Sequence, residues 1–246
     1  MLDATRNSLL ASIDPAAVVL DIGGWADPFE RADWVLDLMP YDTRGLYERE
    51  GWVVPRSIPD RFTRERWIQR DICDHDPFPF EDGSIDFVIC SHTLEDVRDP
   101  VWVCREMNRV AKAGYIEVPS RLEEQSWGVM GQYGVGWAHH RWLIEVEGRG
   151  IEFVLKPHSL HGRLDQHLPP GFWPLLSEAE RIESLLWEDG FSCHERVFVD
   201  EAESDAYLSE AVARGLARHP LPWDLRSRAR RLRNRAGRRL MAVGSG

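Results

Sequence analysis

The 246-residue sequence lacks long apolar runs. Its longest, such as AAVVL and FVIC, fall far short of the ~20 residues that a membrane-spanning helix needs. The first ten residues have neither the basic start nor the apolar centre of a secretory signal. We therefore expect a soluble, cytoplasmic protein, and its 11 tryptophans and 43% apolar residues are enough to form a substantial core.

Cysteine is also scarce. The four cysteines are scattered and form no C-x-x-C pair: Cys73, Cys90, Cys104 and Cys193. This spacing suggests neither a zinc knuckle nor a disulfide framework. We expect these side chains to be small buried hydrophobic residues.

Basic residues are few except at the C-terminal end. Residues 214–246 contain ten Arg and one Asp, a net charge of +9, which leaves the first 213 residues at -20. Such an acidic body should repel nucleic acid, so we predict no nucleic-acid partner. Within residues 224–241 apolar side chains recur at helical spacing among arginines. We expect this tail to be solvated or docked on the acidic body, with peripheral contact to an anionic membrane as the alternative.

Short apolar segments rich in β-branched residues alternate with helical patterns in the first half of the chain. The predicted strands are AAVVLDI (16–22), DWVLDL (33–38), IDFVICS (85–91) and AGYIEVPS (113–120). The segment PVWVCREMNRVAKA (100–113) has one apolar face, and Gly114 should end it as a helix. This alternation predicts an α/β fold with a doubly wound parallel sheet, whose ligands bind at the carboxyl ends of the strands.

The alternation is lost after Ser120. We expect residues 121–175 to form a cap that includes a strand at IEFVLKP, followed by a helix at 177–189 and a last strand at FSCHERVFV. The predicted organisation is therefore one domain over residues 1–200 and a helical, Arg-rich tail over residues 201–246.

A glycine turn follows the first predicted strand. A dinucleotide fingerprint would need glycines at positions 23, 25 and 28, which are here Gly23, Trp25 and Pro28, and the Gly-Lys-Ser/Thr ending of a phosphate-binding loop is absent. What remains is an acidic strand end, Asp21, before a tight turn that lets backbone approach a ligand. Asp37 ends the second strand, where a carboxylate can accept both hydroxyls of a ribose.

Three motifs carry a family resemblance: LDIGG, then RDICDHDPFPFEDGSIDFVICSHTLEDVRDP, then REMNRVAKAGYIEVPS. In this order they resemble the class I S-adenosylmethionine-dependent methyltransferases of the methyltransferase domain 11 type, over about residues 16–121 and the downstream phrase HHRWL. The resemblance implies a Rossmann-like, mostly parallel seven-stranded sheet with a cap after the fifth strand, and S-adenosylmethionine as cofactor. Trp25 stands where the family has a third glycine, and we expect it to cover the turn rather than narrow the pocket.

The resemblance also assigns the cofactor-binding residues. Asp21 and Gly23 would line the methionine part of the cofactor, Asp37 the ribose, and Asp71 with Ile72 the adenine. Gly24 and Leu38 are further predicted cofactor contacts. Ser91 and His92 would face the region of methyl transfer. Asp96 stands where the family often has a second histidine, which leaves that position without an assigned role.

Methyl transfer to a hydroxyl usually needs a base with a pKa near neutrality, which makes histidine the first candidate. Five of the nine histidines lie in the predicted cap: His139, His140, His158, His161 and His167. We predict His140, in the HHRWL phrase, as the general base and His139 as its reserve. The alternative is that His140 binds a backbone carbonyl and holds the cap.

The same region contains residues that could bind a metal or a substrate. Histidine with Asp165 and Glu123 or Glu124 would be a possible metal site, but no H-x-x-x-H or H-E-x-x-H spacing occurs, so we predict no metal. Arg141 and Trp142 are predicted substrate contacts, because arginine can bind an anion and an aromatic face suits a sugar or a flat ring.

The predicted function is O-methylation of a sugar-containing or secondary-metabolite small molecule. The alternatives are an N-methyltransferase and a non-catalytic protein that keeps the fold without the cofactor.

Overall fold

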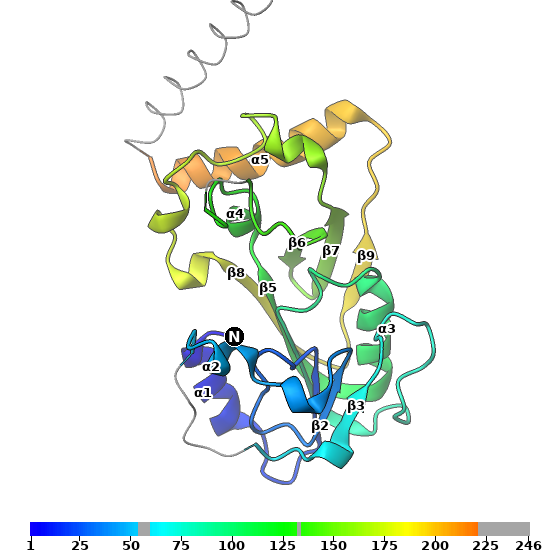
Figure 1. Ribbon diagram of the computed structural model, residues 1–246. Helices are drawn as coiled ribbons and strands as arrows, with labels where there is room; N and C mark the ends of the chain where they lie inside the picture. The colour runs from blue at the N-terminus through cyan, green and yellow to red at the C-terminus, as the bar shows by residue number, and fades with distance from the viewer. Residues whose placement is uncertain (54–59, 132–133, 221–246) are drawn as a thin grey trace, which may run out of the picture. The chain divides into compact units, whose positions relative to one another are not determined.

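The computed structural model describes residues 1–53, 60–131 and 134–220 (Figure 1). The chain divides into two compact units. The first unit consists of Met1–Pro119, Arg141–Leu155 and Ile182–Arg196, and the second of Ser120–His140, Lys156–Arg181 and Val197–Gly246. The division predicted at residue 200 stays a prediction, and the predicted tail helix at 224–241 lies outside the described residues.

A six-stranded sheet forms the centre of the first unit, in the order β3-β2-β1-β4-β5-β8. Its strands are β1 (Val19–Ile22), β2 (Trp34–Asp37), β3 (Trp67–Gln69), β4 (Ile85–Ser91), β5 (Ala111–Pro119) and β8 (Ile182–Glu188). All neighbours run parallel except β8, which pairs antiparallel with β5. The fold is therefore α/β and Rossmann-like with a mostly parallel sheet, as predicted.

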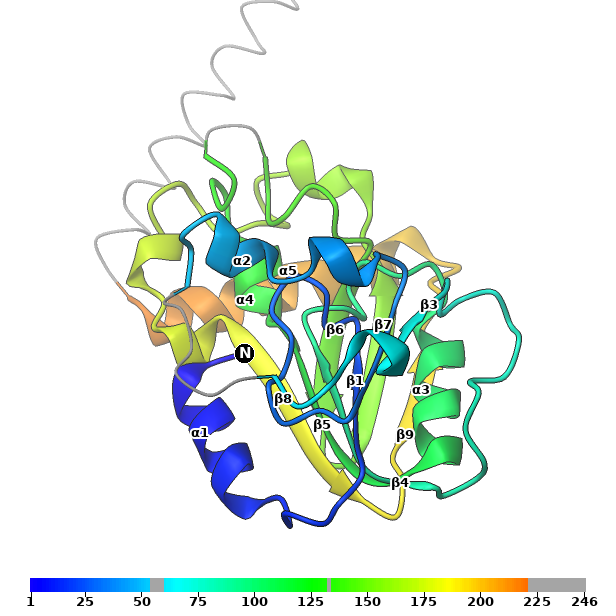
Figure 2. The ribbon, with the colours of Figure 1, turned by 60° about the horizontal axis from the view of Figure 1, so that its bottom comes forward.

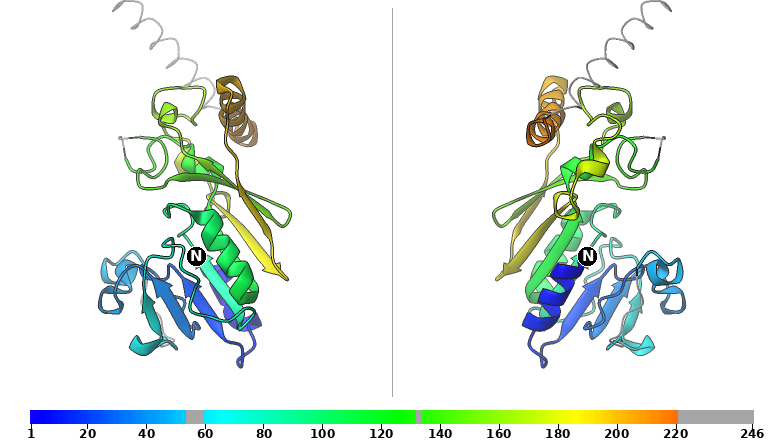
Figure 3. Two further views of the ribbon diagram at one scale, coloured as in Figure 1. Left: turned by 90° about the vertical axis from the view of Figure 1, so that its right-hand side faces the viewer. Right: turned by 90° about the vertical axis from the view of Figure 1, so that its left-hand side faces the viewer.

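Helices α1 (Asp3–Ser12) and α3 (Pro100–Val110) cover opposite faces of this sheet, as the two views of Figure 3 show. Alternate side chains of one strand point to opposite faces. Leu20 and Ile22 of β1 accordingly belong to the apolar cluster that contains α3, whereas Val19 belongs to the cluster of Leu9 on α1. Apolar side chains on both faces explain why the strands read as continuous apolar runs.

Helix α3 begins and ends at residues with clear physical roles. Asp99 precedes it and accepts a hydrogen bond from the backbone N–H of Trp102, and Pro100 occupies the first turn. The helix ends at Val110, earlier than the end predicted at Gly114. Ala111 is already extended and pairs with Ile85 as the start of β5.

A second, three-stranded sheet in the first unit has the order β6-β7-β9 (Figure 2). Its strands are β6 (Trp142–Glu147), β7 (Gly150–Leu155) and β9 (Ser192–Glu195). The strand predicted at IEFVLKP is confirmed as β7. The predicted seven-stranded sheet is wrong: the strand expected at FSCHERVFV is β9, which pairs with β7 instead of joining the large sheet.

The helix predicted at 177–189 is also wrong. Ser177 and Glu180 do form a capping box, but it closes only the short 3-10 helix η5 (Glu178–Glu180). Residues 182–188 instead form β8, in which buried Leu185 and Trp187 alternate with exposed Leu186 and Glu188. Pairing with β5 outweighs the local helical preference.

The second unit contains helices α4 (Arg121–Glu124) and α5 (Glu201–Arg218). Its buried core is Leu122, Leu168, Phe172, Leu176 and Val212. The remaining short helices of both units are η1 (Tyr41–Thr43), α2 (Leu46–Arg49), η2 (Arg64–Arg66), η3 (His158–His161) and η4 (Trp173–Leu175). No helix among the described residues is long and apolar enough to cross a membrane.

Candidate functional site

The glycine turn after β1 is fixed by close packing. Gly23 has φ +76°, its N–H donates to the carbonyl of Leu36 (2.9 Å), and a Cβ there would lie 2.1 Å from Oγ1 of Thr93. A Cβ on Gly24 would lie 2.2 Å from Oδ2 of Asp21. Both positions therefore require glycine.

Trp25, the next residue, is held by three hydrogen bonds. Its backbone N–H donates to Oδ2 of Asp37 (2.9 Å), and its indole N–H donates to Oγ1 of Thr43 (3.0 Å). Its carbonyl accepts from the N–H of Gly45 (2.8 Å). These bonds hold Trp25 against the segment 43–45, and its role in covering the turn stays a prediction.

Two aspartates at adjacent strand ends anchor the turn. Asp21 accepts from the N–H of Phe29 (2.8 Å), and Asp37 accepts from the N–H of Met39 (2.7 Å) as well as from Trp25. Burial raises the pKa of Asp37, although its backbone hydrogen bonds oppose the shift. Leu38, the next residue, is 61% exposed. The first two predicted cofactor contacts thus lie on adjacent parallel strands.

Asp71 and Ile72 follow β3 in the chain and differ in burial and in their contacts. The Asp71 carboxylate pairs with the guanidinium of Arg98 and accepts from the N–H of Cys73 (2.8 Å). The hydrogen bond from Arg98 lowers the pKa of Asp71. Ile72 is buried in the core.

His92 lies between two buried carboxylates at the ends of β4 and β5. Its Nε2 is 3.1 Å from Oε1 of Glu117, and its Nδ1 is 3.4 Å from Oε1 of Glu95. Burial opposes the charged imidazole, but the hydrogen bond with Glu117 and the attraction of the negatively charged Glu95 outweigh it and raise the pKa of His92 to about 9. Ser91, the last residue of β4, has its hydroxyl 3.5 Å from Glu117.

Glu117 is fully buried on β5 and also accepts from the hydroxyl of Tyr115 (2.7 Å). Burial would raise its pKa, but the bond from His92, the N-terminal ammonium and the Tyr115 hydroxyl lower the pKa of Glu117 to about 2. At neutral pH the His92–Glu117 pair is therefore ionised.

Glu95 stands out because it is fully buried, yet neither carboxylate oxygen has a hydrogen-bond donor in the part of the chain that the structure describes. Its ion-pair contact is with His92. Sequence reasoning missed Glu95 and Glu117. The available signals were an acidic residue inside the SHTLED motif and another in the middle of an apolar strand.

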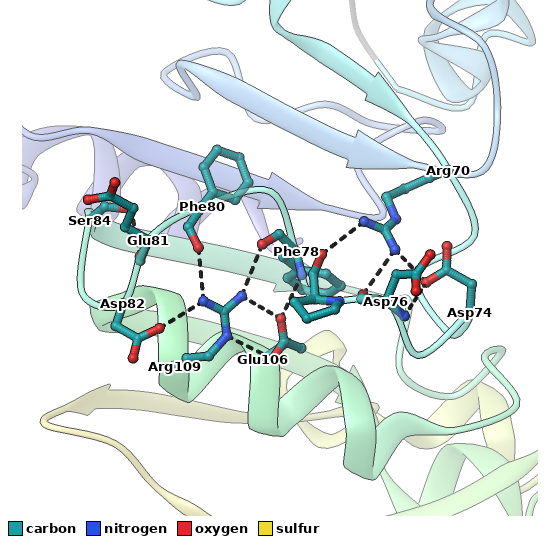
Figure 4. Close-up of polar contacts among 11 residues, drawn as sticks. Arg70, Asp74, Asp76, Phe78, Phe80, Glu81, Asp82, Ser84, Glu106 and Arg109 are labelled. Atoms are coloured by element: carbon teal, nitrogen blue, oxygen red, sulfur yellow. Dashed lines mark hydrogen bonds and ion pairs between the residues drawn. The ribbon is translucent and has the colours of Figure 1, made fainter.

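Arg109, in the third sequence motif, connects this motif to the second one (Figure 4). From α3 it donates to the carbonyls of Phe78 (3.0 Å) and Phe80 (2.9 Å) and pairs with Asp82 (2.9 Å). Glu106, one turn earlier, pairs with Arg109 (2.6 Å) and accepts from the N–H of Phe78 (2.6 Å). The PFPFED loop is thus held by helix side chains, and these motif residues have a structural role.

In the second unit, His140 is bound to a carboxylate. Its Nδ1 lies 2.6 Å from Oε1 of Glu124, and Lys156 donates to Oε2 of the same carboxylate (2.7 Å) and to the carbonyl of Trp137 (2.9 Å). His139 contacts His140 ring to ring, with centroids 4.5 Å apart. Glu124 and Lys156 were not predicted as partners of His140.

The carboxylates considered as metal ligands have other partners. Glu123 accepts from the indole N–H groups of Trp137 (3.0 Å) and Trp173 (2.5 Å), and burial raises its pKa. Asp165 pairs with Arg163 (3.1 Å). The expected absence of a metal stays a prediction.

Other histidines of the predicted cap contact backbone. His161 accepts from the N–H of Val135 (3.2 Å), and Nδ1 of His167 lies 3.2 Å from the carbonyl of Leu168. These two contacts fit the role of holding a chain segment.

The two predicted substrate contacts lie in the first unit. Arg141 is exposed, and its N–H donates to the carbonyl of Glu95 (2.7 Å). Trp142 begins β6, is 6% exposed and donates its indole N–H to the carbonyl of Val97 (2.7 Å). These contacts already give Trp142 a structural role in the core, and its contact with a substrate stays a prediction.

A hollow of about 630 Å³ lies elsewhere in the first unit, against the start of α3 and β9. Its lining includes His75, Trp102, Arg105 and His194, and none of the predicted site residues. Its position gives no support to a role in the predicted chemistry.

Comparison with protein families finds a match for one segment of the chain. Residues 56–116 match the family described as a methyltransferase domain. This stretch includes the PFPFED loop, β4, the His92 turn and the first part of β5. This segment is therefore similar to that family, and the family implies S-adenosylmethionine as cofactor. Among curated proteins no match was found.

Three solved structures of different description match part of the chain. MccD protein is 14% identical, with 48% of this chain and 54% of that one covered and a TM-score of 0.36. A SAM-dependent methyltransferase from Aquifex aeolicus is 16% identical, with 47% of this chain and 64% of that one covered and a TM-score of 0.32. An arsenic(III) S-adenosylmethionine methyltransferase from Chlamydomonas reinhardtii is 17% identical, with 47% of this chain and 48% of that one covered and a TM-score of 0.33. The chain thus spans about half to two thirds of the length of these proteins.

Proposed function

Because residues 56–116 match a methyltransferase domain, we propose that the chain transfers a methyl group from S-adenosylmethionine to a hydroxyl of a small molecule. A sugar-containing compound or a secondary metabolite is the proposed acceptor class. The observation that carries the choice of oxygen is the contact of His140 with Glu124 (2.6 Å). An imidazole held by a carboxylate is the arrangement of a general base, which a hydroxyl acceptor needs and an amine does not.

The proposed cofactor site lies at the carboxyl ends of the parallel strands. Asp21, Gly23 and Gly24 would hold the methionine part, with Asp37 and Leu38 at the ribose. Asp71 and Ile72 would hold the adenine, and Ser91 and His92 would lie toward the transferred methyl. When bound, the cofactor supplies an activated methyl group on a positively charged sulfur.

The residues at these strand ends fit such a ligand. Glu95 presents two buried carboxylate oxygens without a hydrogen-bond donor among the described residues, and an ammonium group such as that of the methionine part has three donors. Buried acceptors without partners are costly, so a ligand that satisfies them gains affinity. Asp37 is fixed by backbone N–H groups, which keeps its carboxylate ready for ribose hydroxyls.

The chain's own residues would then align the acceptor and take its proton. We assign this role to His140, with His139 in reserve, and propose Arg141 and Trp142 as acceptor contacts. His92 is a poorer base, because its raised pKa keeps it protonated at neutral pH.

Further features of the proposal follow from the sequence. The protein would act in the cytoplasm without metal or nucleic acid, and contact of the Arg-rich tail with a membrane remains the alternative to a solvated or docked tail.

Calorimetry tests the proposal. Pure protein, freed of co-purified cofactor, should bind both S-adenosylmethionine and its demethylated product. The absence of heat with either ligand at millimolar concentration would reject the enzyme and favour a non-catalytic protein. An acceptor can then be sought by following formation of the demethylated product with panels of hydroxyl and amine compounds.

A further inference from the structure

We propose that Glu124, with Lys156 beside it, is a positioning residue that fixes the tautomer of His140, so that Nε2 is its basic nitrogen. This inference rests on the proposed function for its consequence, because only a base needs a defined basic nitrogen. Its structural content can be tested without any acceptor.

The three side chains form one connected chain of contacts in the second unit. Glu124 Oε1 meets His140 Nδ1 at 2.6 Å, and Glu124 Oε2 meets Lys156 Nζ at 2.7 Å. The side chains of His140, Glu124 and Lys156 are 8%, 1% and 6% exposed. Because all three are buried, solvent competes little for these contacts.

The backbone closes around this group. Gly136 has φ +61°, and a Cβ there would lie 2.7 Å from Lys156 Nζ and 2.8 Å from Glu124 Oε2. Lys156 also donates to the carbonyl of Trp137 (2.9 Å). The lysine is therefore held by two acceptors, and rotation of the carboxylate away from His140 would break the pair.

The donor and acceptor capacities of these groups determine the tautomer. An ionised carboxylate only accepts hydrogen bonds, so the nitrogen that faces it, Nδ1, must carry a proton. In the neutral imidazole the other nitrogen, Nε2, is then unprotonated and basic. Lysine only donates, so it retains Oε2 and leaves Oε1 for the histidine.

Nitrogen-15 NMR of histidine-labelled protein, without cofactor or acceptor, measures this directly. At a pH where the imidazole is neutral, His140 should show a protonated Nδ1 and an unprotonated Nε2. The opposite tautomer, or an equal mixture of both, in the wild-type protein would overturn the inference whatever any variant does.

Glu124→Gln provides the sharper test. Lys156 needs an acceptor, so it should take the amide oxygen, and the amide N–H₂ should then face Nδ1 of His140. The histidine must switch to the tautomer with protonated Nε2. Lys156→Met should leave the wild-type tautomer in place, because the carboxylate remains.

In the double variant Glu124→Gln/Lys156→Met the wild-type tautomer should return at least in part, because the amide can then turn either its oxygen or its N–H₂ toward Nδ1. Without the lysine, the amide oxygen is available to accept from Nδ1–H. A contact that only stabilised the fold would not produce loss in one variant and recovery in the double variant. Persistence of the switched tautomer in the double variant would contradict the role assigned to Lys156.

Glu123→Gln is the matched control, since Glu123 is the neighbouring buried carboxylate and binds Trp137 and Trp173 instead. It should not alter the His140 tautomer, and a change there would overturn a specific role for Glu124. If the tautomers behave as expected but calorimetry shows no cofactor binding, the proposed function fails while the positioning of His140 stands.

Discussion

Thr93 lies so close to Gly23 that a Cβ on the glycine would be 2.1 Å from the threonine Oγ1. Gly23→Ala should therefore lower the free energy of unfolding by about 1 to 3 kcal/mol through overpacking, with added strain from φ +76°. Chemical denaturation measures the change. Gly83→Ala is the control, because Gly83 has φ +62° with no atom within 4 Å of the added Cβ. Equal losses in the two variants would show that Thr93 does not restrict the turn.

Asp37 should contribute to cofactor affinity. Asp37→Ala is expected to weaken binding of S-adenosylmethionine by about 1 to 3 kcal/mol, because polar groups of the ligand lose their acceptor. Asp37→Asn tests the charge while keeping one oxygen. Calorimetry gives the affinities, and Asp42→Ala, at an exposed carboxylate, should leave them unchanged. Wild-type affinity in both Asp37 variants, once they are shown to be folded, would remove Asp37 from the cofactor site.

His140→Ala should lower the turnover rate with a hydroxyl acceptor by about 100- to 10,000-fold, the usual effect of losing a positioned base. Cofactor affinity should be retained, and the rise of rate through the histidine pKa should flatten. His139→Ala is the control and should keep most of the turnover. Normal turnover with an unchanged pH profile in His140→Ala would shift the search to His139 or to an amine acceptor.

The His92–Glu117 pair should give stability a defined pH dependence. The pKa of His92 is raised to about 9, so its contribution is full below about pH 6.5 and is lost as pH rises through about 9. The pKa of Glu117 is lowered to about 2, so its contribution is full above about pH 4.5 and is lost as pH falls through about 2. Both contributions are complete between about pH 4.5 and 6.5.

Thermal melting between pH 6 and 10 tests the alkaline part. His92→Gln should flatten the loss of stability in this range, whereas His194→Gln, at a 63% exposed histidine, should not. The His92 side chain is 35% exposed, so solvent will reduce the size of the effect. Parallel curves for the wild type and His92→Gln would show that this histidine does not control the alkaline loss.

Arg109 should stabilise the PFPFED loop. Arg109→Ala removes this donor from the carbonyls of Phe78 and Phe80. The Phe78 carbonyl keeps the N–H of Phe80 (2.7 Å), so the cost expected is that of one lost buried hydrogen bond at Phe80, about 1 to 3 kcal/mol. Hydrogen exchange of residues 74–84 should accelerate and the melting temperature should fall. Arg105→Ala, at an exposed arginine on the same helix, should have little effect on either. Unchanged exchange in Arg109→Ala would refute the structural role of this motif residue.

Four of the parallel strands, β1, β2, β4 and β5, and their order along the chain could be predicted from the sequence, whereas the short strand β3 was not predicted. Apolar runs such as IDFVICS are buried on both faces of a parallel sheet, and few other structures accept them, so β4 matches its predicted range. The aspartates at the strand ends were predictable for the same reason, because strand direction places Asp21 and Asp37 at one edge. The motif order also indicated the resemblance to methyltransferases, which the family match over residues 56–116 supports.

The pairing of distant segments could be seen only in the folded structure. Residues 182–188 form a strand because they pair with the edge of β5, and β9 pairs with β7 instead of the large sheet. The hydrophobic pattern of these segments does not determine such pairing. The partners of His140 were equally hidden, since Glu124 and Lys156 lie 16 residues before and after it. Hydrogen-bond capacity and burial select such partners in three dimensions, so sequence could name the histidine while only the fold could show what holds it.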